Sequence, residues 1–163
     1  MSEEQSILQQ RLLGTGIACD PIQPGFDVGR DLRLATGEGG IDLEAVEGMD
    51  NLVQSLEIAL TTALGSDVFN TGFGFDGVNA LVEETRPLLI RERVRIAAIK
   101  TLTADPRVKG IIDLKILDGR LEPVAGAPAQ QSGSARTLAV SVVFETIAGD
   151  QGTASLGRLI EGG

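Results

Sequence analysis

Apolar residues recur at helical spacing in two long segments of the chain. In the first segment, between residues 50 and 64, they fall at i, i+4, i+7, i+8 and i+11, at Leu52, Leu56, Ala59, Leu60 and Ala63. This spacing predicts a helix with one buried face. Asp50 or Asn51 can cap its start, and Gly65 can end it.

The second helical segment begins at Pro87, a residue that favours the first turn of a helix. Its main apolar stripe consists of Ile90, Val94, Ala97, Ala98 and Leu102. Leu89, Ile96 and Ile99 widen the apolar face, whereas Arg91, Arg95 and Lys100 lie largely elsewhere. We therefore expect this helix to pack centrally on a sheet and to touch another chain.

Two later segments alternate between apolar and polar residues, as half-buried strands do. In Val108–Leu117, the apolar residues of one face are Ile112, Leu114 and Ile116. In Thr137–Ile147, they are Leu138, Val140, Val142 and Phe144. The predicted fold class is α+β: a single small domain whose helices pack on a small antiparallel sheet with a C-terminal strand pair.

The remaining segments set the expected domain organisation. Residues 1–30 form an N-terminal extension with a possible short helix at Ser6–Leu13, followed by a loop rich in Pro and Gly. Residues 31–147 form the α+β domain, opening on a short strand within "RDLRLA". Residues 148–163 are rich in Gly and lack periodicity, so we expect a flexible C-terminal tail. A chain of 163 residues fits one domain of this kind.

Composition excludes several kinds of site. Cys19 is the only cysteine and the chain has no histidine, so an internal disulfide and a Cys/His zinc site are both impossible. Gly72, Gly74 and Gly77 satisfy the G-x-G-x-x-G spacing, but no apolar strand precedes them and no long helix follows. We expect these glycines to serve a tight loop, and we expect no metal, cofactor or catalytic residues.

Charge is distributed unevenly along the chain. Residues 1–85 hold 15 acidic and 3 basic residues, whereas residues 86–115 hold 8 basic and 3 acidic ones. The basic segment can be a solvated face, or it can bind a protein partner with acidic patches through Arg91 and Arg95. With 3% aromatic residues and a net charge of -9, nucleic acid is a poor partner.

The N-terminus is acidic where a signal peptide would be basic, and no apolar run is long enough to cross a membrane. These features predict a soluble protein that stays in the cytoplasm, with no export signal and no membrane partner.

Asp105, Pro106 and Arg107 separate the second long helix from the first predicted strand. Together with "DLRLATG", "NLVQSLEIALTTALGSDVFNTGFGFD" and "RERVRIAAIKTLTADPRV", this corner resembles the lysozyme-like baseplate wedge family of contractile phage tails. That family includes the sheath-initiator subunits of type VI secretion baseplates and extracellular contractile injection systems. The similarity covers roughly residues 31–147. The family's Glu-Pro-Arg motif falls on Asp105, Pro106 and Arg107, with Asp in place of Glu.

The resemblance implies a structural role without catalysis, in the baseplate of a phage tail or injection system assembled in the cytoplasm. The implied partners are larger wedge subunits, contacted through the helices and the corner, and sheath protein, contacted through the sheet. Tail tube or hub proteins are further possible partners. The residues alone leave a second interpretation of the corner open, in which Asp105 caps a local turn and Arg107 pairs with it.

Two other functions are the alternatives to this role. A peptidoglycan hydrolase needs two carboxylates across a sugar cleft, and such clefts usually carry aromatic platforms, whereas this chain has five Phe and no Trp or Tyr. A nucleic-acid binder would use the basic segment between Arg86 and Lys115.

The strand at Thr137–Ile147 has no proline and only Glu145 as a charge, so its edge is poorly guarded. We expect it to accept a strand of the sheath subunit along Leu138, Val140, Val142 and Phe144. The alternative is that "RDLRLA" or the C-terminal tail covers that edge within the chain.

Overall fold

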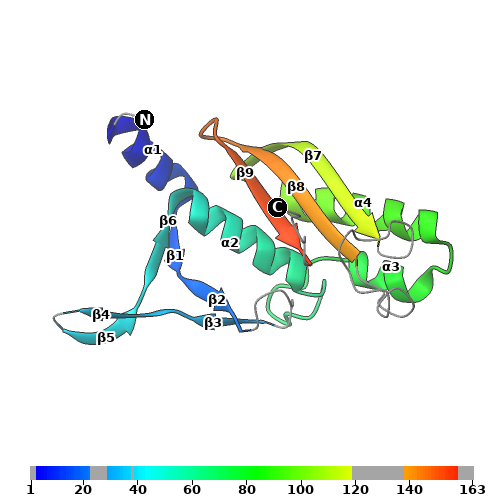
Figure 1. The fold of residues 1–163 in the computed structure, drawn as a ribbon, viewed down its shortest axis with the longest axis horizontal. Helices are drawn as coiled ribbons and strands as arrows, with labels where there is room; N and C mark the ends of the chain where they lie inside the picture. Colours follow the sequence, from blue (N-terminus) through cyan, green and yellow to red (C-terminus); the bar gives the residue numbers. More distant parts are fainter. Residues whose placement is uncertain (1–2, 23–28, 38, 119–137, 158–163) are drawn as a thin grey trace, which may run out of the picture.

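The computed structural model describes residues 3–22, 29–37, 39–118 and 138–157 (Figure 1). The helices are α1 (Glu3–Leu13), α2 (Gly48–Thr61), α3 (Gly77–Glu83) and α4 (Pro87–Thr103). Six short strands precede α2: β1 (Thr15–Ile17), β2 (Cys19–Pro21), β3 (Arg30–Leu32), β4 (Leu34–Gly37), β5 (Gly40–Leu43) and β6 (Ala45–Glu47). Three longer strands follow α4: β7 (Val108–Asp118), β8 (Leu138–Thr146) and β9 (Gln151–Leu156). The predicted α+β class is confirmed.

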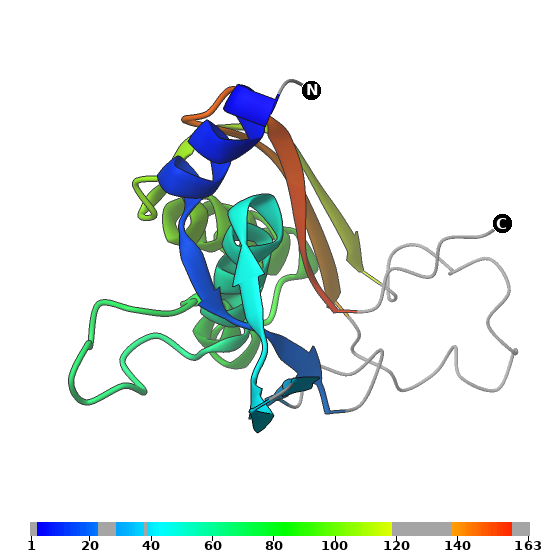
Figure 2. The same cartoon turned by 90° about the vertical axis from the view of Figure 1, so that its left-hand side faces the viewer.

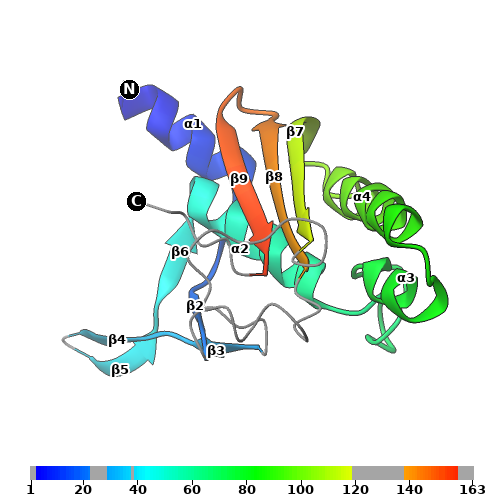
Figure 3. The same cartoon turned by 45° about the vertical axis from the view of Figure 1, so that its right-hand side comes forward.

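The three long strands form one antiparallel sheet in the order β7-β8-β9. Helix α2 packs against β9 and helix α4 against β7. Figure 2 shows this two-layer arrangement from the end, with the helices on one side of the sheet, and Figure 3 shows the three strands side by side. The core therefore lies between one face of the sheet and a layer of two helices.

The helical stripes supply one side of this core. From α2, Leu52, Leu56, Ala59 and Leu60 are buried, as the spacing predicts, whereas Ala63 lies beyond the end of the helix at Thr61 and is exposed. From α4, the buried residues are Ile90, Val94, Ala98 and Leu102. The sheet supplies the other side, where Val140, Val142 and Phe144 of β8 have no exposed surface. Burial of one such side chain contributes about 1.5–3 kcal/mol to folding, so these three residues act as the centre of a hydrophobic core.

The start of α2 differs from the prediction. The helix begins at Gly48, and neither Asp50 nor Asn51 caps it, because both lie within its first turns. Asn51 is buried and instead donates from Nδ2 to the carbonyl of Leu13, the last residue of α1, at 3.1 Å. Its side chain therefore joins two helices.

Strand β7 also departs from the predicted alternation. Its register against β8 shifts between Val108 and Gly110 and again between Ile111 and Asp113. The second shift exchanges the faces, so that Ile111 packs on the core while Ile112 is 51% exposed. A bulge places an extra residue in one strand, and strict period-two counting fails beyond it.

The C-terminal region that the sequence predicts as a flexible tail contains β9, which pairs with β8 from Val140↔Leu156 to Glu145↔Gln151. The N-terminal extension also belongs to the fold, since Leu13 of α1 is fully buried in the core. The predicted helix in residues 6–13 is confirmed, with an earlier start at Glu3. The predicted loop after it contains β1 and β2 instead.

The six short strands form three two-stranded ribbons, β1-β6, β2-β3 and β4-β5. They meet at Ala18, Arg33 and Glu44, whose backbones form a closed ring of hydrogen bonds. Ala18 donates to Glu44, Glu44 donates to Arg33, and Arg33 donates to Ala18, at 2.8, 3.0 and 2.8 Å. The "RDLRLA" segment is thus two strands that diverge at Arg33. Figure 1 shows that β4-β5 projects away from α2, whereas β2-β3 runs back beside it; the three ribbons together are called the arm.

The glycine-rich segment is a loop that folds back on the end of α2, as its glycines predict. Phe75 donates its backbone N–H to the carbonyl of Thr62 at 2.8 Å. Gly74 makes this return possible because its φ is +113° and a Cβ there would lie 2.7 Å from the same carbonyl oxygen. Only glycine fits this combination of conformation and close approach.

We predict that Gly74→Ala lowers the free energy of unfolding by about 2 kcal/mol, since it adds both backbone strain and a steric clash. Gly110→Ala is the matched control because Gly110 has nothing within 4 Å of a Cβ and no positive φ. That control should change stability by no more than about 0.5 kcal/mol. Urea unfolding followed by circular dichroism measures both, and equal effects would contradict the role of Gly74.

Candidate interaction surface

The corner between α4 and β7 is a compact turn built on the Asp105 side chain. Helix α4 ends at Thr103, and Pro106 cannot continue it because it has no N–H to donate. The Asp105 carboxylate accepts the backbone N–H of Arg107 at 2.9 Å, and the Asp105 carbonyl accepts that of Val108 at 3.0 Å. The acid therefore fixes the direction in which β7 begins.

Arg107 in turn donates to the Asp105 carboxylate through two nitrogen atoms of its guanidinium. Its Nε donates to Asp105 Oδ1 at 2.9 Å and its Nη2 to Oδ2 at 2.7 Å. Its Nη1 donates to the carbonyl of Leu13 at 2.9 Å, so the cation also satisfies the C-terminal end of α1. The two side chains are only 23% and 18% exposed. The local interpretation of the corner, in which Asp105 caps a turn and Arg107 pairs with it, is confirmed.

The pair holds Asp105 ionised. Burial of its carboxyl would by itself raise its pKa, but the hydrogen bonds and charge of Arg107 outweigh burial and lower the pKa below the usual 3.8. The same hydrogen bonds, which Arg107 donates to Asp105, raise the pKa of Arg107 against the opposing effect of burial. At neutral pH the corner is therefore a rigid, charge-compensated unit.

A groove of about 1020 Å³ runs from this corner between α2, α4 and the glycine-rich loop. Apolar residues of both helices line it, among them Ile58, Ala59 and Ile96. Ile96 is 64% exposed, although its side chain is apolar. Arg93 and Lys100 add positive charge along α4. The groove thus combines an apolar surface, a basic side and a rigid end formed by Asp105, Pro106 and Arg107.

The other predicted cations of α4 do not line this groove. The Arg95 Nε atom lies 3.9 Å from Glu92 and is buried, with no hydrogen-bond acceptor in the described parts of the chain. Arg91 is half-buried. The groove cation Arg93 pairs instead with Glu83 of α3 at 2.9 Å. Sequence reasoning missed Arg93 and Lys100 because it placed cations by one-turn spacing and could not place the loop that forms the opposite wall.

The predicted open edge at β8 is wrong. This strand is the central one of its sheet, paired with β7 on one side and β9 on the other. Val140, Val142 and Phe144 point into the core and are fully buried, while the side chain of Leu138 lies outside the described residues. The alternative in which the C-terminal segment covers this strand is confirmed. Among the described residues, the edges of this sheet are therefore β7 and β9.

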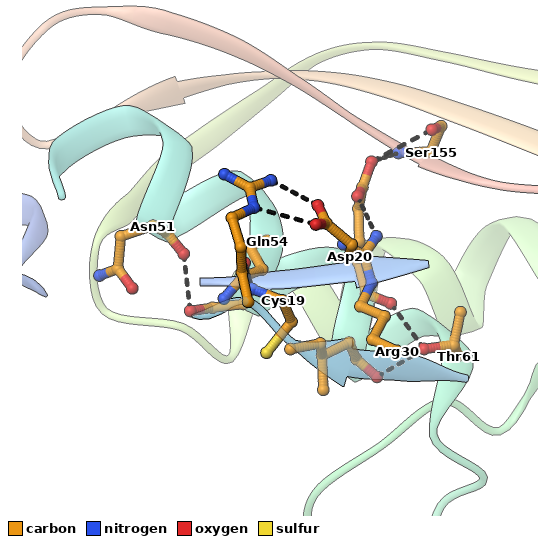
Figure 4. A network of polar contacts seen from close by, with 11 residues as sticks. Cys19, Asp20, Arg30, Asn51, Gln54, Thr61 and Ser155 are labelled. Atoms are coloured by element: carbon orange, nitrogen blue, oxygen red, sulfur yellow. Dashed lines mark hydrogen bonds and ion pairs between the residues drawn. The ribbon is translucent and has the colours of Figure 1, made fainter. Parts of the chain in front are cut away.

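A polar network that the sequence did not reveal ties the arm to α2 (Figure 4). Gln54 of α2 accepts the backbone N–H of Cys19 at 2.8 Å and donates to the carbonyl of Ile17 at 2.8 Å. One turn later, Glu57 pairs with Arg30 of β3 at 2.5 Å. The other Glu57 oxygen accepts from the backbone N–H and the hydroxyl of Ser155 in β9, at 3.3 and 3.2 Å. Glu57 therefore connects the arm, α2 and the sheet.

Within the described parts of the chain, no group of three or more His, Cys, Asp and Glu side chains is placed to hold a metal ion. None of the described helices is long and apolar enough to span a membrane. Searches against models of protein families and against curated proteins found no match to this chain.

We predict that Arg107→Ala lowers the free energy of unfolding by about 2 kcal/mol at pH 7, because the partly buried Asp105 carboxylate loses its two guanidinium donors and the Leu13 carbonyl loses one of its two donors. The pKa of Asp105 is lowered in the folded state, so its pairing stabilises the fold above its unfolded value of 3.8 and is lost as pH falls further. The difference in the free energy of unfolding between Arg107→Ala and wild type should therefore narrow in strong acid. It should not vanish, because the contact of Arg107 with the Leu13 carbonyl persists in wild type.

The control for this experiment is Lys109→Ala, which removes an exposed ion pair with Glu145. Exposed pairs contribute little, so its cost should stay within about 1 kcal/mol. Thermal unfolding at pH 7 and at pH 2.5 measures both variants. An Arg107→Ala protein as stable as wild type at pH 7 would contradict the bracing role.

Proposed function

We propose that this chain is a non-enzymatic structural subunit of a contractile-tail baseplate, comparable to the lysozyme-like wedge and sheath-initiator proteins. In this role it packs with larger wedge subunits and templates the first ring of the sheath by strand addition. The observation that carries the proposal is the position of the Asp105–Pro106–Arg107 corner. It is braced internally, it ends the groove, and it leads directly into an edge strand of the sheet.

The groove suits a protein partner better than a small substrate. Its apolar wall includes Ile96, which is largely exposed in the described chain, and cations accompany it along α4. Apolar surface at the centre with charge at the rim is typical of protein interfaces. Wedge subunits would contact the corner and α4, through Arg93 and Lys100 in the groove and through Arg91 and Arg95 on the part of α4 outside it.

The groove gives little support to a glycoside hydrolase. Its carboxylates are those of Asp76 and Asp105. A glycosidase needs a general acid whose pKa is raised, whereas Arg107 lowers that of Asp105. The paired carboxylate would stay ionised where the reaction requires a proton.

Affinity purification of the tagged chain from its source tests the proposed function. The expected result is co-purification of wedge and sheath subunits in particles that electron microscopy recognises as contractile tails or their baseplates. Lysis of purified peptidoglycan by sub-stoichiometric protein, or recovery of the chain free of any such particle, would contradict the proposal.

We predict that association with the wedge subunits weakens as salt rises, because screening reduces attraction between the cations of α4 and an acidic partner surface. Two double variants, Arg91→Ala with Arg95→Ala and Arg93→Ala with Lys100→Ala, should each weaken binding and flatten the salt dependence. Arg11→Ala, which removes an exposed cation of α1, is the control. Binding that is indifferent to salt in the wild type would assign the interface to apolar contacts alone.

A further inference from the structure

The two edge strands of the sheet differ in the kind of acceptor that holds an outward backbone N–H group. Thr146 donates its N–H to the carbonyl of Asp150, at the turn that joins β8 to β9. Hydrogen-bonded and non-bonded pairs alternate along an antiparallel ladder. Counting from this bond, Val142↔Ala154 is a bonded pair and Ser141↔Ser155 is not. The N–H of Ser155 therefore points away from β8, toward the outer edge of the sheet.

That outward N–H of β9 is occupied. Glu57 Oε1 accepts it at 3.3 Å and also accepts the Ser155 hydroxyl at 3.2 Å. The Glu57 side chain is only 19% exposed, and its second oxygen is held by Arg30 of the arm. Helix α2 packs against β9, and Ala154 is fully buried. An incoming strand would have to displace this partly buried carboxylate in order to pair with Ser155.

The edge of β7 is different. By the same alternation, Leu114 and Ile116 lie opposite Val142 and Val140 at positions whose N–H points outward. The Leu114 N–H is bonded to the carboxylate of the preceding Asp113 at 2.9 Å. That carboxylate is 51% exposed, and its one ion-pair partner among the described residues is Lys115, at 3.7 Å. A local, solvated contact of this kind costs little to replace.

The outward side chains of β7 define what can lie beside it. Beyond the bulge, Ile112 and Leu117 are 51% and 40% exposed on the sheet face that is turned away from the helices. Between them stands Lys115, whose side chain is 75% exposed. A strand laid along this edge would bring apolar side chains against the two hydrophobic residues and would place one side chain next to the lysine.

Resting on the proposed function, we infer that the partner strand adds to the outer edge of β7 and not to β9. The partner segment is extended and carries an acidic side chain beside Lys115, with apolar residues against Ile112 and Leu117. Glu57 keeps the β9 edge closed, so the sheet grows in one direction only. The docking edge also continues from the Asp105–Pro106–Arg107 corner, so the wedge and sheath contacts would lie on one continuous surface.

Hydrogen exchange in the free protein tests the premise. The amide hydrogen of Ser155 should exchange at least tenfold more slowly than that of Ile116. Glu57 accepts the Ser155 N–H, whereas the outward N–H of Ile116 has no acceptor among the described residues. Glu57→Ala should remove the difference. Equal exchange in the wild type would show that β9 is no more closed than β7, and would overturn the inference.

Photo-cross-linking in the assembled particle tests the docking edge itself. The photoreactive residue p-benzoylphenylalanine replaces Ile112 or Leu117 on β7, and Gln151 or Thr153 on β9, four positions that are all exposed in the free chain. The expected result is a cross-link to the sheath subunit from the β7 positions only. Cross-links from the β9 positions alone would overturn the inference and leave the proposed function standing. Absence of the sheath subunit from all four products, with the chain outside any contractile particle, would refute both.

Charge variants test the same edge in a second experiment. Lys115→Glu should reduce sheath recruitment at least tenfold, because it sets like charges side by side. Thr153→Glu places the same new charge on β9 and should leave recruitment unchanged. Circular dichroism confirms that both variants fold. Loss of recruitment in Thr153→Glu but not in Lys115→Glu would reverse the assignment of the edge.

Discussion

The carbonyl oxygen of Leu13 holds together parts of the chain that lie far apart in sequence. It accepts one hydrogen bond from Arg107 at the start of β7 and one from Asn51 in α2. Because Leu13 ends α1, this oxygen would otherwise have no helical partner. Its two donors fix α1 against α2 and fix the corner against both. The groove keeps its shape for the same reason, since the braced corner is its end wall and α2 is its floor. A surface held in this way can bind a partner without first paying for its own ordering.

Backbone N–H groups at exposed strand edges need hydrogen-bond acceptors, and in this chain aspartate and glutamate carboxylates supply several of them. Leu32, Leu43 and Leu114 each follow an aspartate, and in each case the leucine N–H donates to the carboxylate before it, at 2.8, 2.8 and 2.9 Å. Unpaired edge amides invite aggregation, and a side chain that satisfies them blunts the edge. These contacts are local and exposed. The contact between Glu57 and Ser155 is long-range and partly buried, which sets β9 apart from the other edges.

The sequence predicted the elements whose signal is periodic and long. The stripes of α2 and α4 and the strands β7 and β8 follow directly from apolar spacing, and so does the α+β class. It failed where the structure depends on contacts between distant residues. The sequence predicted a Gly-rich tail in place of β9, because the strand is stabilised by pairing with β8 and packing on α2 and not by a pattern in its own residues. The short ribbons of the arm are hidden for the same reason. The Asp105–Pro106–Arg107 corner was visible as a motif, but its contact with Leu13 spans 94 residues and leaves no local pattern.

The uneven charge of the chain acquires a physical meaning once the fold is known. The acidic N-terminal half builds the arm and α2, where Arg30 and Arg33 neutralise part of its charge by pairing with Glu57, Asp20 and Glu44. The basic segment builds α4, the corner and β7, which are the elements that border the groove and one edge of the sheet. Positive charge is thus concentrated on the surface where apolar residues are also exposed, while the rest of the molecule repels acidic partners. An acidic partner would therefore be guided to α4 and β7 before any close contact forms, since long-range attraction selects orientation and apolar contact then fixes it.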